Sequence, residues 1–497
     1  VLFMVPLRNA LIVEEHGALP FPEGTACAEV LLAGEEGGAK SKVVFAGLGI
    51  SALYKFITDG LKLFPSEVHW NLRSLRTAFG LDVLPALAGV GYICGQRVAA
   101  NMFAGGVLGW FVLIPAIVLF GGDNMIAPAA DRISEMDVMS IWGSYIRYIG
   151  AGAVAAGGII SLIKSLPLIV STFKDSLKGL KGGTKAGSLR TEQDLDMRLV
   201  LGGSLVLILV IWLLPAIPVS LIGALLVVVF GFFFATVSSR MVGLVGSSNN
   251  PVSGMAIATL LFSTLVLKVT GNTGVSGMIG AIAIGSVICI VAAMAGDTSQ
   301  DLKTGYILGA TPKKQQIGEL LGAVVAAFTI GGVLLLLNSA WGFGTTELAA
   351  PQATLMKMIT EGVMNGNLPW PLVLIGIFAA IVVEILGIPV LPVAIGLYLP
   401  LELSATIMIG GVIRWIVDKK SADKNGEASG GVLFCSGLIA GEGLVGILLA
   451  ILAVVGVSSK FDLSSSVNTG RIGGIVLLAI MIACVFIFAM PKKKVEK

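Results

Sequence analysis

Long apolar blocks run through this sequence, and they limit the folds that it can adopt. A helix needs about 20 mostly apolar residues to cross the hydrocarbon of a bilayer. Most of the blocks approach or exceed that length, and one weaker candidate lies at 350–366. The blocks lie at about 43–64, 80–96, 99–121, 141–170, 199–214, 216–235, 253–270, 275–296, 317–338, 371–389, 391–417, 430–456 and 473–490. We therefore predict an all-α, polytopic helical membrane protein with about 12–14 membrane segments.

The composition agrees with this prediction. Hydrophobic residues make up 56% of the chain and charged residues only 13%, with a mean hydropathy of +0.94, whereas soluble domains carry about 25% charged residues. The 65 glycines suit close contacts between membrane helices, which small residues permit. The five cysteines form no Cys-x-x-Cys pair, so the sequence predicts neither a disulfide framework nor a metal site.

Basic loops give the expected topology, because Lys and Arg mark cytoplasmic connections. The loop 172–198 is rich in Lys and Arg, as are the turn 303–314, the loop 418–424 and the C-terminal tail. If all four are cytoplasmic, the weak segment 350–366 must cross the membrane to keep an even number of spans.

We predict one integral membrane transporter domain over residues 1–497. Its N-terminal half ends at 171, a basic cytoplasmic linker covers 172–198, and the C-terminal half covers 199–497 with a cytoplasmic C-terminus. The first residues resemble the end of a hydrophobic segment, so we expect the chain to be truncated and further helices to precede it.

Two loop segments resemble each other and predict an internal repeat. Residues 19–32 and 247–261 each have proline followed by Gly-x-Ala-x-Ala and an apolar run, with Gly24 aligned on Gly254. Free N–H groups at such a helix start can bind a carboxylate, and paired broken helices are typical of a transporter's central site. We therefore predict broken or re-entrant helices that bind substrate. The predicted substrate-binding residues in these segments are Pro22, Glu23, Gly24, Thr25, Asn249, Asn250, Pro251, Ser253 and Gly254.

Three motifs resemble those of the oligopeptide transporter (OPT) superfamily. Asn-Pro-Val-Ser-Gly at 250–254 is similar to the family signature, and Gln-Asp-Leu-Lys-Thr-Gly-Tyr at 300–306 is similar to a second family loop. Leu-Pro-Phe-Pro-Glu-Gly-Thr-Ala at 19–26 resembles the Tyr-Pro-Ser-Gly-Thr-Ala segment of the yellow-stripe-like branch, with Phe21 and Glu23 replacing its Tyr and Ser. The chain most resembles a prokaryotic member related to that branch. The resemblance implies import of small peptides, or of metals chelated by peptide-like ligands, driven by the proton gradient without a cofactor.

Ionisable residues in apolar segments are candidates for proton coupling, because an unpaired charge at bilayer depth is costly. Glu384 and Glu442 lie in such segments, and Glu442 is also a candidate substrate ligand. The alternative is a carboxylate tied to a backbone N–H or to Lys268. A second group, expected to gate or shape the pathway, consists of Asp297, Gln300, Asp301 and Lys303. Its alternative is a cytoplasmic turn with an internal salt bridge.

These observations favour a secondary transporter of the cytoplasmic membrane that imports oligopeptides with protons by alternating access. A substrate carboxylate would meet helix N-termini, and a substrate amine or bound metal would meet Glu23 or Glu442. Import of metal–siderophore or other metal chelates is the alternative, and a homo-oligomer stays open. An intramembrane enzyme is disfavoured because the sequence has only two distant histidines and lacks His-Glu-x-x-His, Gly-x-Ser-x-Gly and P-loop motifs. Nothing indicates a nucleic-acid partner.

Overall fold

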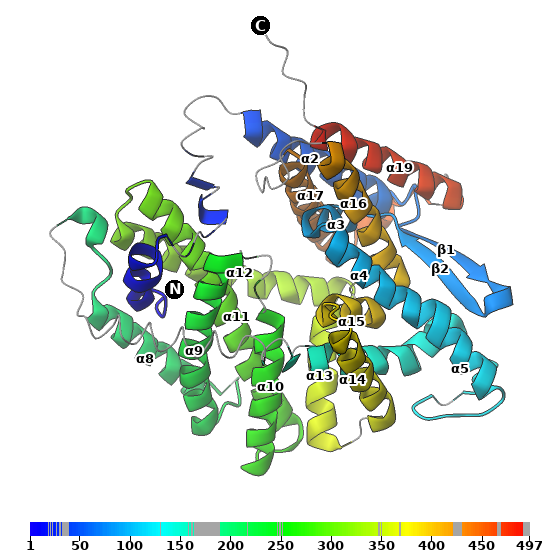
Figure 1. Cartoon of the computed structure of the whole chain (residues 1–497), viewed down its shortest axis with the longest axis horizontal. Coiled ribbons are helices and arrows are strands. Elements are labelled where there is room, and N and C mark those ends of the chain that lie inside the picture. The colour runs from blue at the N-terminus through cyan, green and yellow to red at the C-terminus, as the bar shows by residue number, and fades with distance from the viewer. Residues whose placement is uncertain are drawn as a thin grey trace, which may run out of the picture. The chain divides into compact units, whose positions relative to one another are not determined.

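The computed structural model of the chain describes most of its residues (Figure 1). The described residues are 1–17, 19, 21, 23–25, 27–28, 31, 39–129, 131–157, 159–160, 163, 189–215, 217–245, 247, 250, 252–345, 348, 350–366, 369–420, 430–464 and 469–490. The predicted linker 172–198 therefore lies mostly outside them.

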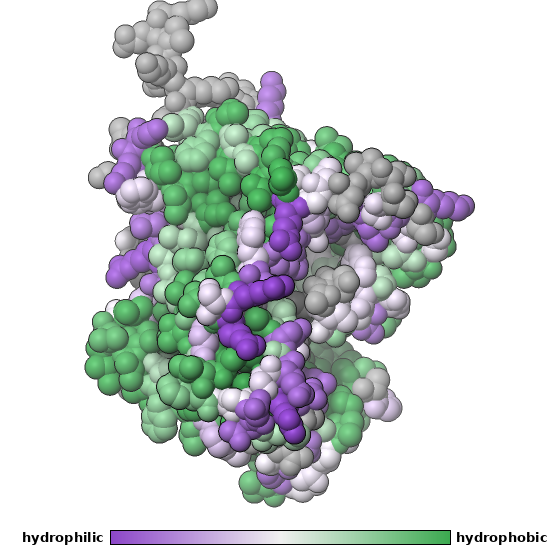
Figure 2. Space-filling view, turned by 90° about the vertical axis from the view of Figure 1, so that its right-hand side faces the viewer, coloured by the Kyte–Doolittle hydropathy of each residue, from purple (hydrophilic) through white to green (hydrophobic). Residues whose placement is uncertain are grey.

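The helical membrane class is confirmed. Within the described residues, eight helices are long and apolar enough to cross a membrane, and the surface drawn in Figure 2 is largely hydrophobic. These candidate spans are Lys42–Gly60, Gln96–Gly121, Arg190–Leu213, Leu221–Gly243, Gly274–Ile307, Pro312–Ala340, Gly430–Val454 and Gly470–Ala489. Shorter apolar helices occupy Pro85–Cys94, Met255–Val269 and Trp370–Ile385.

Within the described residues, one predicted segment is broken and another forms a short helix, which is one reason that they contain fewer long helices than the predicted 12–14 spans. The block 391–417 contains two helices, α15 (Val390–Tyr398) and α16 (Leu401–Lys420), separated at Leu399 and Pro400. The weak segment 350–366 forms the 15-residue helix α13 (Pro351–Asn365). Proline lacks the N–H that continues a helix, so it favours such breaks.

Contacts divide the chain into two compact units, each containing segments from both sides of the predicted linker. The first unit contains 1–36, 158–331 and 352–368, and the second contains 37–157, 332–351 and 369–497.

The first unit is built around the long helix α11 (Gly274–Ile307), which packs against α9 (Leu221–Val245) and α10 (Val252–Val269). Its other described elements are η1 (Val5–Leu7), η2 (Asn9–Glu14), η7 (Arg190–Glu192), α8 (Met197–Leu213), most of α12 (Pro312–Ala340) and α13. The N-terminal segment joins this unit through buried apolar side chains that include Met4, Leu11 and Phe21. Arg8 fixes it further by an ion pair with Asp194, with Nε 2.5 Å from Oδ1.

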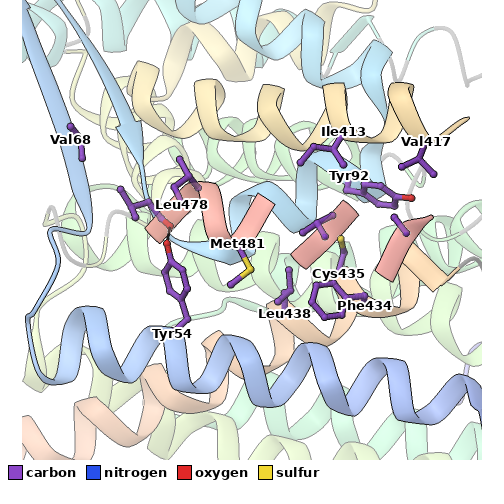
Figure 3. Packing of buried hydrophobic residues seen from close by; sticks show 13 residues of the cluster. Tyr54, Val68, Tyr92, Ile413, Val417, Phe434, Cys435, Leu438, Leu478 and Met481 are labelled. Atoms are coloured by element: carbon purple, nitrogen blue, oxygen red, sulfur yellow. Dashed lines mark hydrogen bonds between the residues drawn. The ribbon is translucent and has the colours of Figure 1, made fainter. Parts of the chain in front are cut away.

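In the second unit, α2 (Ala39–Lys55) packs along α17 (Gly430–Val454), and α16 packs against α3 (Pro85–Cys94) and α4 (Gln96–Val107). Figure 3 shows the buried cluster that α2, α3, α16, α17 and α19 (Gly470–Ala489) share. The other described helices of the second unit are η3 (Phe56–Gly60), η4 (Arg73–Leu75), η5 (Leu108–Leu113), α5 (Ile114–Gly121), α6 (Val138–Ile141), η6 (Trp142–Ile146), α14 (Trp370–Ile385), α15 and α18 (Ser458–Phe461).

Glycine makes the close contact between α2 and α17 possible. A Cβ on Gly47 of α2 would lie 2.2 Å from the carbonyl oxygen of Phe434 on α17, and a Cβ on Gly437 would lie 2.2 Å from that of Val44. The two backbones therefore meet where neither helix has a side chain, as expected for association without a hydrophobic driving force.

A two-stranded antiparallel hairpin in the second unit was not predicted. Strand β1 (Glu67–Leu72) pairs with β2 (Thr77–Asp82), with Glu67 opposite Asp82, and the pair extends beyond its neighbouring helices in Figure 1. The predicted block 80–96 therefore begins in a strand, and its helix begins only at Pro85.

Candidate functional site

The first candidate site joins all three sequence motifs inside the first unit. Glu23, from the first motif, lies in a helical turn, and its carboxylate accepts a hydrogen bond from the backbone N–H of Ser247, with Oε1 2.6 Å from N. Its second oxygen accepts a hydrogen bond from Nε2 of Gln300, from the third motif. Both oxygens of Glu23 are therefore engaged, and the carboxylate connects segments more than 200 residues apart.

Gln300 also binds the backbone of the first motif. Its Oε1 accepts a hydrogen bond from the N–H of Gly24 at 2.6 Å, and Thr304, one turn later on α11, donates to the Gly24 carbonyl at 2.8 Å. A Cβ on Gly24 would lie 2.4 Å from the Gln300 carbonyl oxygen, so only glycine allows this approach. These bonds fix the first motif against α11.

Lys303 is buried, with 1% of its surface exposed. Its Nζ lies 2.8 Å from His16 Nδ1, donates to the Leu19 carbonyl at 3.0 Å, and lies 5.4 Å from the centre of the Phe21 ring. Charge-assisted hydrogen bonds and a cation–π contact stabilise the buried ammonium. Lys303 thus holds the chain before Glu23, as a structural anchor of the loop that leads into the site.

Asn250 is the described part of the second motif. Its Nδ2 donates to Ser238 Oγ at 2.7 Å, and Ser238 in turn donates to the Ala292 carbonyl. Its buried Oδ1 has no hydrogen-bond partner among the described residues. Outside the described residues lie Pro22, Asn249, Pro251 and the side chain of Ser253. Ser253 and Gly254 belong to the first turn of α10, which begins at Val252.

Asp297 and Asp301 lie one turn apart on α11, and both are exposed, unlike Gln300 and Lys303. The Asp301 carbonyl accepts a hydrogen bond from Gln315 Nε2 at 2.5 Å. The motif is therefore amphipathic: one face of α11 holds the first motif, and the other presents two carboxylates. Thr25, the remaining predicted residue, is half-buried, and its N–H donates to the Phe21 carbonyl at 2.9 Å.

Replacing Thr304 by valine tests this network at low cost to packing. The variant removes the hydroxyl that binds Gly24, and we expect a loss of about 1 kcal/mol of stability and a fall in Tm of about 2 °C in detergent. Thr329→Val on the exposed face of α12 is the control, since Thr329 bonds only carbonyls of its own helix. Equal Tm values for the two variants would contradict a stabilising role of the Thr304–Gly24 hydrogen bond.

A cavity of about 1250 Å³ in the second unit forms a second candidate site. Its walls carry charges of both signs, with six carboxyl groups and four cationic groups. The carboxyl groups belong to Asp59, Glu67, Asp82, Glu402, Glu442 and Asp462, and the cations to Lys55, Lys62, Arg147 and Arg471. Its volume exceeds the roughly 300–1,000 Å³ of common small-molecule pockets.

Glu442 lies on this cavity. Its Oε2 accepts a hydrogen bond from the N–H of Ala86, in the first turn of α3, at 2.8 Å, and its Oε1 lies 3.9 Å from Lys55 Nζ. Glu442 therefore makes the hydrogen bond to a backbone N–H that the alternative interpretation expected, and it also lines the cavity, where a ligand can reach it. Lys268, the other alternative partner, instead donates to the Val363 carbonyl at 2.7 Å. Glu384 is half-buried in the last turn of α14, where Gly387 and Pro389 follow.

Asp82 and Lys55 were missed from the sequence. Asp82 ends β2, and its Oδ1 accepts a hydrogen bond from the Leu84 N–H at 2.8 Å. Burial raises the pKa of Asp82 to about 8, assisted by the nearby Glu442 carboxylate and opposed by the Leu84 hydrogen bond. Lys55 and Asp59, an i,i+4 ion pair at 2.5 Å, lie within the predicted apolar block 43–64, so the rule applied to Glu384 would have found them.

Sequence comparisons relate the chain to membrane transporters. Residues 1–453 match the family model described as OPT oligopeptide transporter protein. A Haemophilus influenzae protein named "Putative oligopeptide transporter" is 32% identical, with the match covering all of this chain and 87% of that protein. Two proteins of Oryza sativa subsp. japonica, each named a "Probable metal-nicotianamine transporter" (YSL11 and YSL12), are 22% and 26% identical. These matches cover 92% and 94% of this chain, and 69% and 71% of the respective relatives.

Proposed function

We propose that this chain, which belongs to the OPT oligopeptide transporter family, is a proton-coupled secondary transporter that imports small oligopeptides by alternating access. It would lie in the cytoplasmic membrane with its C-terminus inside. Family membership and the apolar helices make it an integral membrane transporter rather than an enzyme.

The observation that carries the peptide proposal is the charged cavity of the second unit. A peptide with free termini has an ammonium group, a carboxylate and a polar backbone, so it needs a chamber with charges of both signs. The cavity offers the carboxylate of Glu442 to the ammonium group. It offers Arg147 to the carboxylate, and no carboxylate of the described residues lies within ion-pair distance of this guanidinium.

Coupling to protons is supported by the buried carboxyl group of Asp82. Asp82 holds its proton near neutral pH because burial raises its pKa to about 8, and such a group can bind and release protons within the physiological range. The chain has no P-loop signature that would indicate ATP-driven transport.

Import of a metal chelate is the second candidate, favoured by the rice relatives, which are named metal-nicotianamine transporters. A chelate of a peptide-like ligand presents carboxylate and amine groups similar to those of a peptide, so the same cavity suits both.

The test uses the full-length protein in liposomes with an acidic exterior. Uptake of a labelled tetrapeptide is compared with uptake of a ferric peptide-like chelate, with and without a protonophore. We expect tetrapeptide accumulation that collapses with the gradient. Accumulation of the chelate alone would support metal-chelate import instead of peptide import. If neither compound accumulates, both proposals are contradicted.

A further inference from the structure

We propose that Asp82 and Glu442 form one composite site, in which Asp82 binds the transported proton and Glu442 binds the primary ammonium group of the peptide. The inference rests on the proposed function and specifies how substrate and proton enter together. It also assigns proton coupling to Asp82, a residue that the sequence did not indicate.

The two carboxylates bind backbone N–H groups that lie two residues apart in the chain. Asp82 ends β2 and binds the N–H of Leu84, whereas Glu442 reaches from α17 to the N–H of Ala86. Both distances are 2.8 Å. These bonds hold two acids from separate elements beside the first turn of α3, where the helix dipole favours negative charge.

The cluster formed by Asp59, Asp82, Glu442 and Lys55 has too little positive charge to balance its carboxylates. Lys55 is the cation nearest to it, and its Nζ lies 2.5 Å from Asp59 but 3.9 Å from Glu442. The lysine is therefore engaged mainly by Asp59, and the second oxygen of Glu442 has only a distant partner. An ammonium group placed at this oxygen would make the short charge-assisted bond that Lys55 does not make.

Charge balance predicts what the site takes up. Asp59, Asp82 and Glu442 carry three negative charges when ionised, and Lys55 carries one positive charge, so two negative charges have no compensation within the cluster. Uncompensated charges in surroundings of low dielectric constant are costly. One proton on Asp82 and one ammonium group at Glu442 remove the imbalance among these four residues, which favours their joint binding.

Four other titratable groups lie around Asp82. Tyr54 faces it from α2, Glu67 from β1 and Glu402 lines the same cavity from α16. His69 interacts with both Glu67 and Glu402. The additional carboxyl groups increase the demand for cations, and the Glu67 carboxylate acts in the same direction as the burial that raises the pKa of Asp82.

Asp82→Asn separates proton binding from substrate binding. The amide keeps the size of the side chain and an oxygen for the Leu84 N–H, so peptide exchange without a gradient should persist. Gradient-driven accumulation of a labelled tetrapeptide should fall at least about tenfold. Wild-type uptake should decline as the external pH rises through about 8, because the protonated fraction of Asp82 falls there, and the variant should show no such decline.

Glu442→Gln tests the ammonium site through the substrate. The wild type should bind the free tetrapeptide at least about tenfold better than its N-acetylated form, measured as competition in the exchange assay. The glutamine variant should lose this preference, and Glu442→Asp should keep it, which guards against a folding defect. Asp123→Asn, an exposed residue bonded to Ser134 outside the cavity, controls for the loss of one negative charge.

The outcomes distinguish the inference from the function on which it rests. Absence of tetrapeptide uptake by the wild type would overturn the proposed function. Wild-type accumulation together with undiminished accumulation by Asp82→Asn would overturn the proton site alone. Retained preference for the free amine in Glu442→Gln would overturn the ammonium site.

Discussion

Gly441→Ala is expected to destabilise the second unit by about 3 kcal/mol, near the upper end of the usual range for overpacking. An added Cβ would lie 2.3 Å from the Leu48 carbonyl oxygen on α2. A backbone carbonyl in a helix cannot rotate away without breaking its own hydrogen bond, so α2 and α17 would have to separate. The measurement is the Tm of the purified protein in detergent, together with the yield of monodisperse protein.

Gly443→Ala is the matched control on the same helix. A Cβ at Gly443 would meet nothing within 4 Å, and alanine favours a helix more than glycine does. We expect this variant to be as stable as the wild type or slightly more stable. Equal losses for both variants would show that Glu442 requires flexible neighbours, and would contradict close helix packing as the role of Gly441.

The sequence predicted the membrane-helix class because apolar length is a local property that survives any arrangement of the helices. It could not predict the hairpin. Residues 67–82 contain charged and polar side chains between two apolar blocks, which is typical of a loop. Their strands are defined by cross-strand pairing, including the stacked rings of Trp70 and Phe79 at 5.8 Å. Such pairing depends on partners rather than on intrinsic preference.

Residues chosen for their motifs lie together in the structure, while their substrate-binding and gating roles stay predictions. The first and third motifs were selected separately, and Glu23, Gly24 and Gln300 lie in contact. The second site shows the limit of this reasoning. Glu442 was selected as an isolated charge, but its partners Lys55 and Ala86 lie more than 350 residues away in sequence, and no spacing rule connects them.

Glu23→Gln is expected to disrupt the motif cluster without leaving a cavity. Both carboxylate oxygens accept hydrogen bonds, one from the Ser247 N–H and one from Gln300 Nε2. A glutamine at position 23 places its NH₂ group against one of these donors in either orientation of the amide. One buried donor then loses its acceptor, and the remaining bond loses its charge assistance, so we expect a loss of about 3 kcal/mol and at least a tenfold fall in uptake.

Two comparisons identify the cause of such a loss. Glu14→Gln changes an exposed carboxylate of the same N-terminal segment and should leave Tm and uptake unchanged. Gln300→Ala should combine non-additively with Glu23→Gln, because each variant removes the same bond, and the double variant should be more stable than the sum of the single losses predicts. Additive losses would mean that the two residues act separately. Because Gln300 also binds Gly24, a residual loss from its second bond is expected even in the Glu23→Gln background.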